Sequence, residues 1–429
     1  MSNDNNHGHL IFVSIAAYRD PQLVPTIEDC IVKAAHPERL RFGICWQHDP
    51  TEDTLPFRSD DCFRILAIDW RDSKGACWAR AEIMKLWRGE PWFLQVDSHC
   101  RFAPDWDTKL IEAMALTASE KPILSTYASP FTPGENELLV DGPLQMALQG
   151  FTPEGIPHMK PIAIPNWQRL TRPRRARFLS AGFLFAPGSF VEELGYDPEL
   201  YFLGEEAAIT VRAFTHGYDL FHPHQTLIWH DYGRPNAPKH WGDHIETNNV
   251  RRQWHDLDAH SRQKVKKLLT GQPVENFGLG SARTLQQYQD YAGLSFLLGK
   301  AQEYTVRSEE PPNPPADPDW AGQIFSWMVR IYLQRDALPA AALTDPEFWV
   351  VAVNDESGTE IYRTDVPQAQ LSPLLDEQAP LVLFCEFESA TVPARWSVWP
   401  VSQSQGWLRK LEAALGPEDF TIVLEEAPL

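Results

Sequence analysis

Two residue types suited to metal chemistry follow an apolar run in the first quarter of the chain. Asp97, Ser98 and His99 come directly after residues 92–96, which are predicted to form a buried strand. In open α/β sheets ligands bind beyond the carboxyl ends of the strands, so this triplet stands where a site is expected. Asp97 offers a hard oxygen and His99 an imidazole nitrogen, a donor set that suits manganese or a similar divalent ion. The alternative is an aspartate that caps a turn beside an unrelated histidine.

A second polar cluster also ends an apolar run. His230 follows Ile228 and Trp229, and Arg234 stands four residues later. His230 is a candidate third ligand for the same cation, and Arg234 is a candidate for a bidentate contact with a phosphate. Because histidines are frequent nearby, a purely structural role for His230 stays open. These neighbours are His222, His224, His240 and His244.

Paired acids at Glu205 and Glu206 follow Gly204 at the start of a predicted helix. Acidic residues in a first helical turn are stabilised by the helix dipole, so capping alone explains the pair. The functional alternative is a carboxylate that hydrogen-bonds the hydroxyls of a sugar or an acceptor.

The elements that must position these residues alternate between β-type and helical patterns through about residue 235. This alternation predicts an α/β fold with a largely parallel central sheet. Strands are expected at residues 10–16, 41–47, 63–68, 92–96 and 123–127, regular structure at 178–185, and β-type runs near 220 and at 226–230. Helices are expected at residues 23–35, 76–86, 106–116, 205–215, within 243–269, and at 285–291.

The stretch from residue 128 to residue 177 interrupts this pattern. It is rich in proline and has few periodic segments, which predicts a long irregular loop of the kind that is usually functional or mobile. The loop ends in a basic run from Arg172 to Arg177. That run is either a solvated loop or a contact with a phosphate or an acceptor.

The last quarter of the chain is predicted to be a separate module. Residues 309–315 read Glu-Glu-Pro-Pro-Asn-Pro-Pro, which is typical of a linker. Alternating apolar runs at 348–353 and 381–384 predict a β-rich module with one or two helices, and no motif indicates its role. We therefore expect a catalytic domain at 8–300 with a helical extension at about 240–300, a Pro-rich linker at 301–317, and a C-terminal module at 318–429.

Charge and cysteine content exclude several classes of protein. Lys and Arg number 38 against 58 Asp and Glu, a formal charge of −20. A surface this acidic repels phosphate backbones and anionic lipid, which argues against nucleic acid and membrane surfaces as partners. The six cysteines form no CxxC pair, so we expect buried free thiols. No apolar stretch is long enough to span a membrane and the polar start is no signal peptide, so we expect a soluble, cytoplasmic protein.

Six motifs stand in a fixed order along the chain. They are Val13-Ser14-Ile15-Ala16-Ala17-Tyr18-Arg19-Asp20, Ser73-Lys74-Gly75-Ala76-Cys77-Trp78-Ala79-Arg80-Ala81, Asp97-Ser98-His99-Cys100, Ser180-Ala181-Gly182-Phe183-Leu184-Phe185, Gly204-Glu205-Glu206 and His230-Asp231-Tyr232-Gly233-Arg234. With these motifs the chain resembles the GlcNAc-transferase family, whose known eukaryotic members are cytoplasmic hydroxyproline N-acetylglucosaminyltransferases. The resemblance covers roughly residues 8–240. It also extends to the mucin-type polypeptide N-acetylgalactosaminyltransferases, which share the Asp-Ser-His-Cys string.

This resemblance implies a fold of the GT-A type, the nucleotide-diphospho-sugar transferase fold, and a set of roles. Asp97, His99 and His230 would be the metal ligands, with manganese expected and magnesium as the other candidate, and the ion would bridge the diphosphate of a UDP-sugar. Glu205 and Glu206 would be the catalytic acids that hold the sugar or the acceptor. The residues implied to contact the nucleotide-sugar are Ala17, Tyr18, Arg19, Asp69, Arg80, Asp97, Ser98 and Arg234.

The chain differs from the mucin-type enzymes in two features, which limit what the resemblance to them implies. They have Trp-Gly-Gly-Glu-Asn where this chain has Phe-Leu-Gly-Glu-Glu at 202–206, so sugar identity and acceptor placement are not carried over from them. They also have a trefoil-type lectin domain, and the segment after the linker shows no threefold repeat.

The function predicted on these grounds is metal-dependent transfer of a sugar, expected to be GlcNAc, from a UDP-sugar to an acceptor hydroxyl. Because the relatives retain anomeric configuration and the chain offers no obvious nucleophilic carboxylate, we expect front-face transfer with retention. The acceptor is expected to be a protein or a glycan, and the oligomeric state is open. Two alternatives remain: a metal-dependent hydrolase, and a non-catalytic protein that binds a nucleotide-sugar or a partner.

Overall fold

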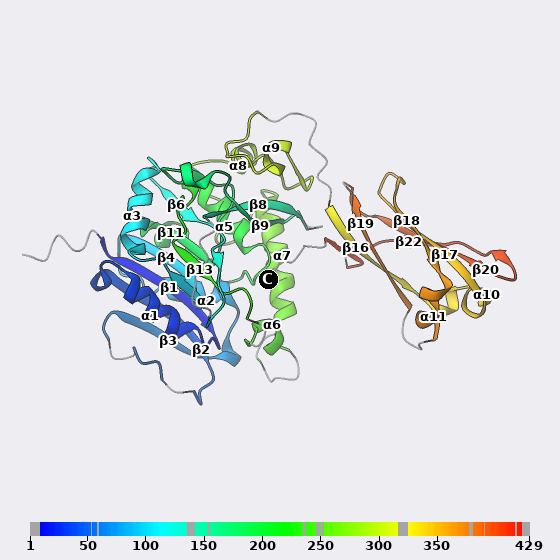
Figure 1. The fold of residues 1–429 in the computed structure, drawn as a ribbon, viewed down its shortest axis with the longest axis horizontal. Helices are drawn as coiled ribbons and strands as arrows, with labels where there is room; N and C mark the ends of the chain where they lie inside the picture. The colour runs from blue at the N-terminus through cyan, green and yellow to red at the C-terminus, as the bar shows by residue number, and fades with distance from the viewer. Residues whose placement is uncertain are drawn as a thin grey trace, which may run out of the picture.

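A large mixed sheet forms the centre of the first two thirds of the chain (Figure 1). The computed structural model describes residues 9–52, 54–57, 60–134, 142–152, 155–234, 237–245, 250, 253–315, 325–376, 381–389, 391–416 and 418–422. The predicted domain boundaries at residues 8 and 318 therefore lie outside the described residues.

The central sheet has the strand order β10-β12-β6-β11-β4-β1-β2-β3, and all strands run parallel except β10 and β11. This arrangement confirms the predicted α/β fold with a mostly parallel sheet. The strands are β1 (Ile11–Tyr18), β2 (Leu40–His48), β3 (Phe63–Asp69), β4 (Trp92–Asp97), β6 (Pro122–Ser125), β10 (Arg174–Arg175), β11 (Phe183–Pro187) and β12 (Asp219–His222).

Helices cover both faces of this sheet, which is why its strands are apolar on both sides. Along β1, Phe12 packs with one core cluster and Val13 and Ile15 with the other, because successive side chains of a strand point to opposite faces. Helices α1 (Leu23–Lys33) and α3 (Trp106–Leu116) share the cluster of Val13. Helices α2 (Ala76–Met84) and α5 (Glu205–Thr215) share the cluster of Phe12. A short helix, α4 (Ser189–Glu193), follows β11.

The prediction of an irregular loop over residues 128–177 is wrong for its middle part. Strands β8 (Leu144–Phe151) and β9 (Pro157–Ala163) pair as an antiparallel hairpin. Proline lacks an N–H donor but is tolerated on strands with a free edge, and each strand of a two-stranded sheet has one. Pro157 and Pro161 both lie in β9, so they masked a strand in the sequence pattern.

A second, three-stranded sheet lies next to the predicted metal residues. It consists of β5 (Cys100–Phe102), β13 (Ile228–His230) and β7 (Ser129–Pro130), with β13 in the middle. In this sheet His230 lies opposite Cys100. The pairing therefore brings the second polar cluster of the sequence beside the first.

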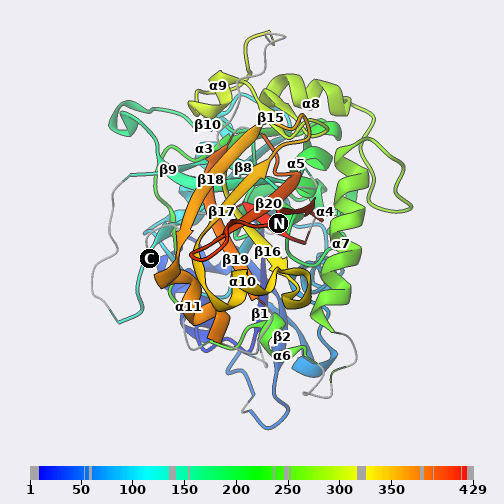
Figure 2. The same ribbon diagram turned by 90° about the vertical axis from the view of Figure 1, so that its right-hand side faces the viewer.

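The segment after β13 is helical, as predicted. It contains α6 (His240–Asp243), α7 (Trp254–Leu269) and α8 (Leu285–Ala292), and α7 runs along one side of the molecule (Figure 2). Residues 294–315 add β14 (Leu294–Ser295), β15 (Lys300–Ala301) and α9 (Glu303–Val306). Part of the predicted linker packs on the first domain, because the Asn313 amide donates to the Tyr291 carbonyl at 2.8 Å.

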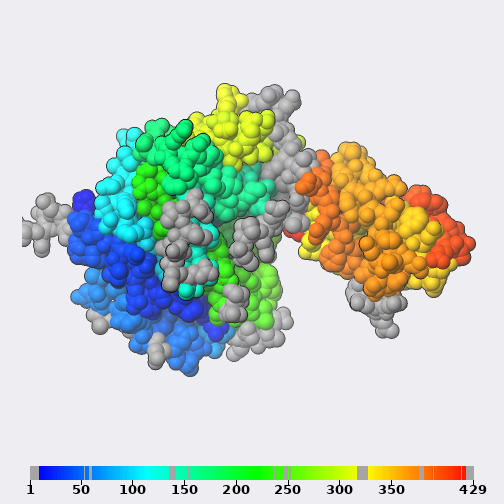
Figure 3. Space-filling model, viewed as in Figure 1, coloured from blue at the N-terminus to red at the C-terminus, as the bar shows by residue number. Residues whose placement is uncertain are grey.

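The C-terminal residues form a body of strands that is separate from the α/β part in the space-filling view (Figure 3). One sheet has the order β19-β16-β23 and the other the order β18-β17-β20-β21, with β22 also paired to β20. The elements are β16 (Phe325–Leu333), α10 (Ala340–Thr344), β17 (Pro346–Asn354), β18 (Glu360–Pro367), α11 (Gln368–Asp376), β19 (Leu381–Ser389), β20 (Arg395–Ser402), β21 (Gly406–Trp407), β22 (Leu411–Ala414) and β23 (Phe420–Ile422). This β-rich composition with two short helices agrees with the prediction.

Two further predictions concern cysteine and membrane segments. All six cysteines are free thiols, and every one except Cys62 is buried, as expected. Within the described ranges, none of the helices combines the length and the apolar character that a membrane crossing requires.

Candidate functional site

Asp97, His99 and His230 converge at the carboxyl end of β4. One potential ligand atom from each lies within 4.8 Å of the others. Nε2 of His230 is 3.2 Å from Oδ2 of Asp97, and the two imidazole rings are 4.4 Å apart between centroids. The pairing of β13 with β5 produces this convergence, so residues more than 130 positions apart in the chain form one donor set.

A buried aspartate that the sequence analysis did not single out orients His99. Oδ2 of Asp20 accepts a hydrogen bond from Nδ1 of His99 at 2.7 Å and from Oγ of Ser98 at 2.6 Å, and the Asp20 side chain is 1% exposed. A proton on Nδ1 makes Nε2 the acceptor nitrogen of the ring, as at many metal-bound histidines, and this nitrogen faces Nη1 of Arg234. The sequence signal was an acid two residues beyond the end of the first strand.

Charge explains why Asp20 stays ionised despite its burial. Burial raises the pKa of Asp20, but the hydrogen bonds of His99 and Ser98 and the charge of Arg234 lower it below its usual value. Arg234 contributes through Nη2, which is 3.1 Å from Oδ2 of Asp20. Its Nη1 lies 3.2 Å from Nε2 of His99. The structure thus brings Arg234 beside the predicted metal ligands.

Arg80 of helix α2 binds Asp97 and connects it to Glu205. The Arg80 side chain is buried, donates from Nη2 to Oδ1 of Asp97 at 2.8 Å, and donates from Nη1 to Oε1 of Glu205. Burial raises the pKa of Asp97, but the hydrogen bond of His230 and the charge of Arg80 outweigh it and hold the pKa well below its usual range. Asp97 is therefore a fixed carboxylate with Oδ2 turned toward the histidines.

The donor set fits a divalent cation. It contains one carboxylate oxygen and imidazole nitrogens, the mixture expected for manganese or a similar ion. Nδ1 of His230 is buried and has no hydrogen-bond partner among the described residues, so the ring keeps a nitrogen unused by the protein. His99 already has the partner that fixes its orientation, and Asp97 has lost its proton.

Gly182 permits the close approach of another strand to this centre. Its carbonyl accepts from the Asp97 amide at 3.2 Å, and a Cβ at this position would stand 3.0 Å from Oδ2 of Asp97. That contact is tighter than about nine in ten real Cβ contacts, so a side chain here would press on Oδ2 of Asp97. This gives a physical reason for the glycine in the Ser-Ala-Gly motif.

The residues expected to border the nucleotide lie at the carboxyl end of β1, beside β4. Ala17 is fully buried within the strand. The Tyr18 hydroxyl and Nη1 of Arg19 donate to Oδ2 of Asp243 at 3.0 and 2.8 Å. Arg19 has φ = 47°, a left-handed conformation that is uncommon for a residue with a side chain. Helix α6 therefore contributes Asp243 next to this group, a contact that the sequence analysis did not foresee.

Asp69 lies further along the same edge, at the end of β3. Two strands separate it from β4, since the order is β4-β1-β2-β3. Its Oδ1 accepts from the Arg71 backbone amide at 2.9 Å and from Nη1 of Arg71 at 3.1 Å. The structure does not bring Asp69 to the metal-type cluster, and its predicted contact with the base or ribose stays a prediction.

The paired acids of α5 face different surroundings. Glu205 is buried and accepts from Arg80 and, at 2.5 Å, from the Tyr196 hydroxyl. Glu206 is partly exposed and accepts from the Tyr127 hydroxyl at 2.6 Å and the Ala181 amide at 2.9 Å. Burial raises the pKa of Glu206 to about 7, although both hydrogen bonds oppose the rise.

Comparison with known proteins gives the family of this chain. The family described as "Glycosyltransferase (GlcNAc)" matches residues 10–63 and 53–298, more than half of the chain. The chain belongs to this glycosyltransferase family, and the predicted GT-A type of α/β fold is confirmed. Among curated protein sequences there is no significant match.

Solved glycosyltransferase structures are similar at low identity. GalNAc-T7 with UDP, GalNAc and Mn²⁺ has a TM-score of 0.45 and 15% identity over 65% of this chain and 54% of that chain. TarS 1-349 of S. aureus has a TM-score of 0.36 and 12% identity over 60% and 72%. The mannosyltransferase PcManGT of Pyrobaculum calidifontis with GDP-Man and Mn²⁺ has a TM-score of 0.35 and 10% identity, over 53% of this chain and 58% of that chain. The chain thus spans about half of the GalNAc-T7 chain.

Proposed function

We propose that this protein is a metal-dependent glycosyltransferase that moves GlcNAc from UDP-GlcNAc to an acceptor hydroxyl with retention of anomeric configuration. The observation that carries the proposal is the convergence of Asp97, His99 and His230 within 4.8 Å at the carboxyl end of β4, in a chain of the GlcNAc glycosyltransferase family. That sheet edge is where α/β folds bind their ligands.

On the donor side, Asp97, His99 and His230 would hold a divalent ion, with Mn²⁺ expected. When bound, such an ion stabilises the negative charge that grows on the phosphate of the departing UDP. The guanidinium group of Arg234 lies next to Nε2 of His99 and is suited to a bidentate phosphate contact. Tyr18 and Arg19 would border the nucleotide once their contacts with Asp243 exchange for ligand contacts.

Two buried residues would act by positioning. Arg80 donates to both Asp97 and Glu205, so it sets the direction of the metal-facing carboxylate without an exposed nitrogen of its own. Glu205 would hold Arg80 in place rather than contact the sugar. This is a different role from the catalytic one expected from the sequence, and it rests on the burial of Glu205.

Glu206 is the better candidate of the acidic pair for a contact with sugar or acceptor. It is partly exposed, and its pKa near 7 allows it to accept or donate a hydrogen bond near neutral pH. Front-face transfer fits these surroundings. Asp20, Asp97, Glu205 and Glu206 all accept hydrogen bonds from protein groups that hold them in place, so none is placed as a free nucleophile. The departing phosphate would then accept the proton of the acceptor hydroxyl.

The alternatives are a metal-dependent hydrolase, which the same three ligands would serve, and a non-catalytic binding protein. The family match favours the transferase over both. The acceptor, a protein or a glycan, and the boundaries of the domains stay predictions, as does the cytoplasmic localisation.

The test is release of UDP from a panel of UDP-sugars with Mn²⁺, comparing the wild type with His230→Ala. We expect turnover of UDP-GlcNAc alone, dependent on an acceptor, and a fall of about a thousandfold in the variant, since a metal contributes several kcal/mol to such a transition state. Circular dichroism and melting temperature check that the variant folds. Release of free GlcNAc without any acceptor would support the hydrolase, and binding without turnover would support the binding protein. A β-linked product would contradict retention.

A further inference from the structure

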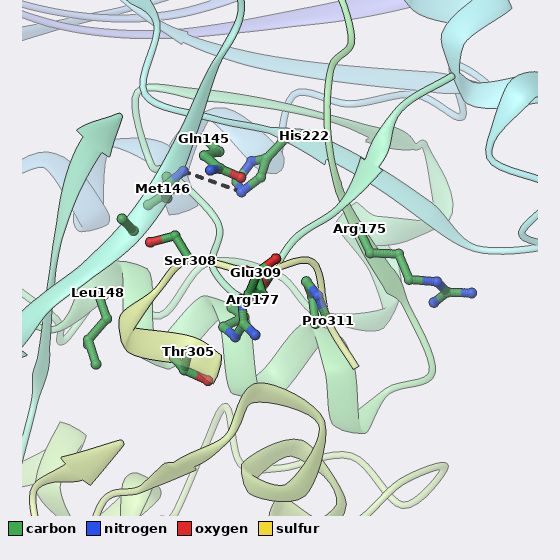
Figure 4. Close-up of a pocket in the computed structure, with 11 residues that line it drawn as sticks. Gln145, Met146, Leu148, Arg175, Arg177, His222, Thr305, Ser308, Glu309 and Pro311 are labelled. Carbon is green, nitrogen blue, oxygen red and sulfur yellow. Dashed lines mark hydrogen bonds between the residues drawn. The ribbon is translucent and has the colours of Figure 1, made fainter. Parts of the chain in front are cut away.

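A polar cavity of the α/β domain is too small to hold a ligand. It lies where β8 and β12 meet the segment that follows α9, and its lining includes Gln145, Arg177 and His222 (Figure 4). The free space has room for about one water molecule. The C-terminal strands present a larger surface, and it carries aromatic side chains.

Two tryptophans are exposed on the outer face of the sheet β18-β17-β20-β21. In Figure 2 this sheet lies in front of the α/β domain. Trp349 of β17 is fully buried in the core, so Phe348 and Val350 on either side of it point to the opposite, outer face. Trp399 lies opposite Val350 on β20, and Trp407 of β21 lies in the same row as Phe348. Both tryptophans therefore belong to the outer face, where Trp399 is 40% and Trp407 is 54% exposed.

These two tryptophans, the aromatic pair, are held in fixed positions. Their ring centroids are 4.6 Å apart and their planes meet at 53°. The indole N–H of Trp399 donates to the Leu408 carbonyl at 2.8 Å, and Phe348 meets Trp407 edge-on with ring centroids 6.0 Å apart. Because the rings are ordered before a ligand binds, binding costs less conformational entropy.

Charged side chains stand beside the aromatic pair on the same face. Asp365 of β18 lies opposite Val350, in the row of Trp399 and two strands away from it, which is about 10 Å. Arg363 lies opposite Ala352 in the next row of this face. Both charged residues are exposed. A molecule that rests on Trp399 and extends across two strands therefore meets a carboxylate and a guanidinium group.

The size of the aromatic pair favours one kind of partner. An aromatic side chain offers up to about 250 Å², so two tryptophans that are near half exposed present roughly 200 Å². A stable protein interface buries about 800 Å² on each partner, several times more. A membrane surface is disfavoured, because acidic residues greatly outnumber Lys and Arg after residue 318. A short oligosaccharide has matching dimensions.

We propose that the aromatic pair binds a neutral oligosaccharide of pyranose rings whose hydroxyls are equatorial. The C–H groups on the faces of such rings carry partial positive charge and stack on the negative face of an indole. The hydroxyls at the ring edge can donate to Asp365 and accept from Arg363. Since the indole planes meet at an angle, the pair fits a bent, soluble chain better than the flat face of a polymer. This binding needs neither metal nor turnover, so it does not depend on the proposed function.

The first experiment is titration calorimetry of the whole chain with cellohexaose, a neutral hexasaccharide of β-1,4-linked glucose, in metal-free buffer. Burial of roughly 200 Å² of apolar surface corresponds to a dissociation constant of about 0.1–1 mM. We expect saturable binding in this range for the wild type. Tyr332→Ala is the matched control and should bind equally well, because Tyr332 is a similarly exposed aromatic residue of β16 in the other sheet.

Substitutions on the outer face test the mode of binding. Trp407→Phe keeps an aromatic ring and should lower the affinity by no more than about threefold, whereas Trp407→Leu keeps apolar surface without a ring and should lower it about tenfold. Asp365→Asn should lower the affinity about fivefold, because it weakens a hydrogen bond to a charged group. Circular dichroism checks that each variant folds, and Asp365→Asn keeps the test decisive if a Trp407 variant does not fold.

Three results would overturn the proposal. The first is the absence of saturable cellohexaose binding by the wild type. The second is an affinity in Trp407→Leu and Asp365→Asn equal to that of the wild type, because the sugar would then bind elsewhere. The third is a dimer, seen by analytical ultracentrifugation, that dissociates in Trp407→Leu, because a second copy of the chain would then cover the aromatic pair. Failure of every transfer assay would count against the proposed function alone.

Discussion

Two buried arginines of the α/β domain have opposite surroundings. Arg80 donates to the carboxylates of Asp97 and Glu205, whereas Arg177 donates to the carbonyls of Ala292 and Glu309. Burial lowers the pKa of each, but the negative charges around Arg80 raise its pKa well above the usual value, while the pKa of Arg177 falls to about 10. The first arginine is part of a charge network within the protein, whereas the second donates to neutral carbonyl groups.

The largest expected effect is on the Arg80 side of this comparison. Arg80→Gln removes the positive charge that faces the buried carboxylate of Glu205 and Oδ1 of Asp97. We expect a loss of about 3–5 kcal/mol in the free energy of unfolding, measured by urea denaturation. The double variant Arg80→Gln/Glu205→Gln should recover part of this loss, because it removes one of the two charges.

The same substitution at Arg177 provides the matched control. Arg177→Gln removes hydrogen bonds to two carbonyls and leaves no buried carboxylate, so in phosphate-free buffer we expect a loss of about 1–2 kcal/mol. Equal losses at the two positions would contradict the contrast between a paired and an unpaired arginine.

A pH-dependent effect of intermediate size is expected at Glu206, which neighbours the Arg80 network. The folded-state pKa of Glu206 is about 7, raised by burial above the ordinary value of 4.5. The folded state therefore binds the proton more tightly than the unfolded state. This contribution to stability is complete below pH 4.5 and is lost as the pH rises through 7.

Glu206→Gln removes this dependence. Between pH 4.5 and pH 8 the difference in unfolding free energy should move in favour of the variant by about 2–3 kcal/mol, measured by urea denaturation at each pH. Parallel stability curves for the wild type and the variant would show that Glu206 titrates normally.

The effect expected on ligand affinity, rather than on folding, concerns the support of His99. Asp20→Asn keeps the shape of the side chain but removes the charge that orients the imidazole. We expect Mn²⁺ affinity, measured by titration calorimetry, to fall about 10–100-fold, the usual cost of losing such a partner. Ser98→Ala is the matched control, since it removes the other hydrogen bond to Asp20 and leaves the carboxylate in place. An unchanged affinity in Asp20→Asn would mean that His99 is held by its surroundings alone.

Periodicity in the sequence was sufficient for most of the elements that carry the site. The helices predicted at 106–116 and 205–215 have the bounds of α3 and α5, and the strand predicted at 92–96 forms β4. Apolar periodicity depends on neighbours a few residues away, so it can be seen without the fold. The hairpin of β8 and β9 was missed, because its stability comes from pairing between strands while its prolines suggest a loop.

By itself, the sequence determined the α/β class, the family motifs, and the types of residue at the metal-type cluster. Tertiary structure alone decided which partners these residues meet. The hydrogen bonds of the site join residues far apart in the chain: Asp20 with His99, Arg80 with Asp97 and Glu205, and Asp243 with Tyr18 and Arg19. The fold also places the Arg177 guanidinium against the carbonyls of Ala292 and Glu309. Hydrogen bonds and ion pairs act over a few ångströms of space, and separation along the chain carries no information about them.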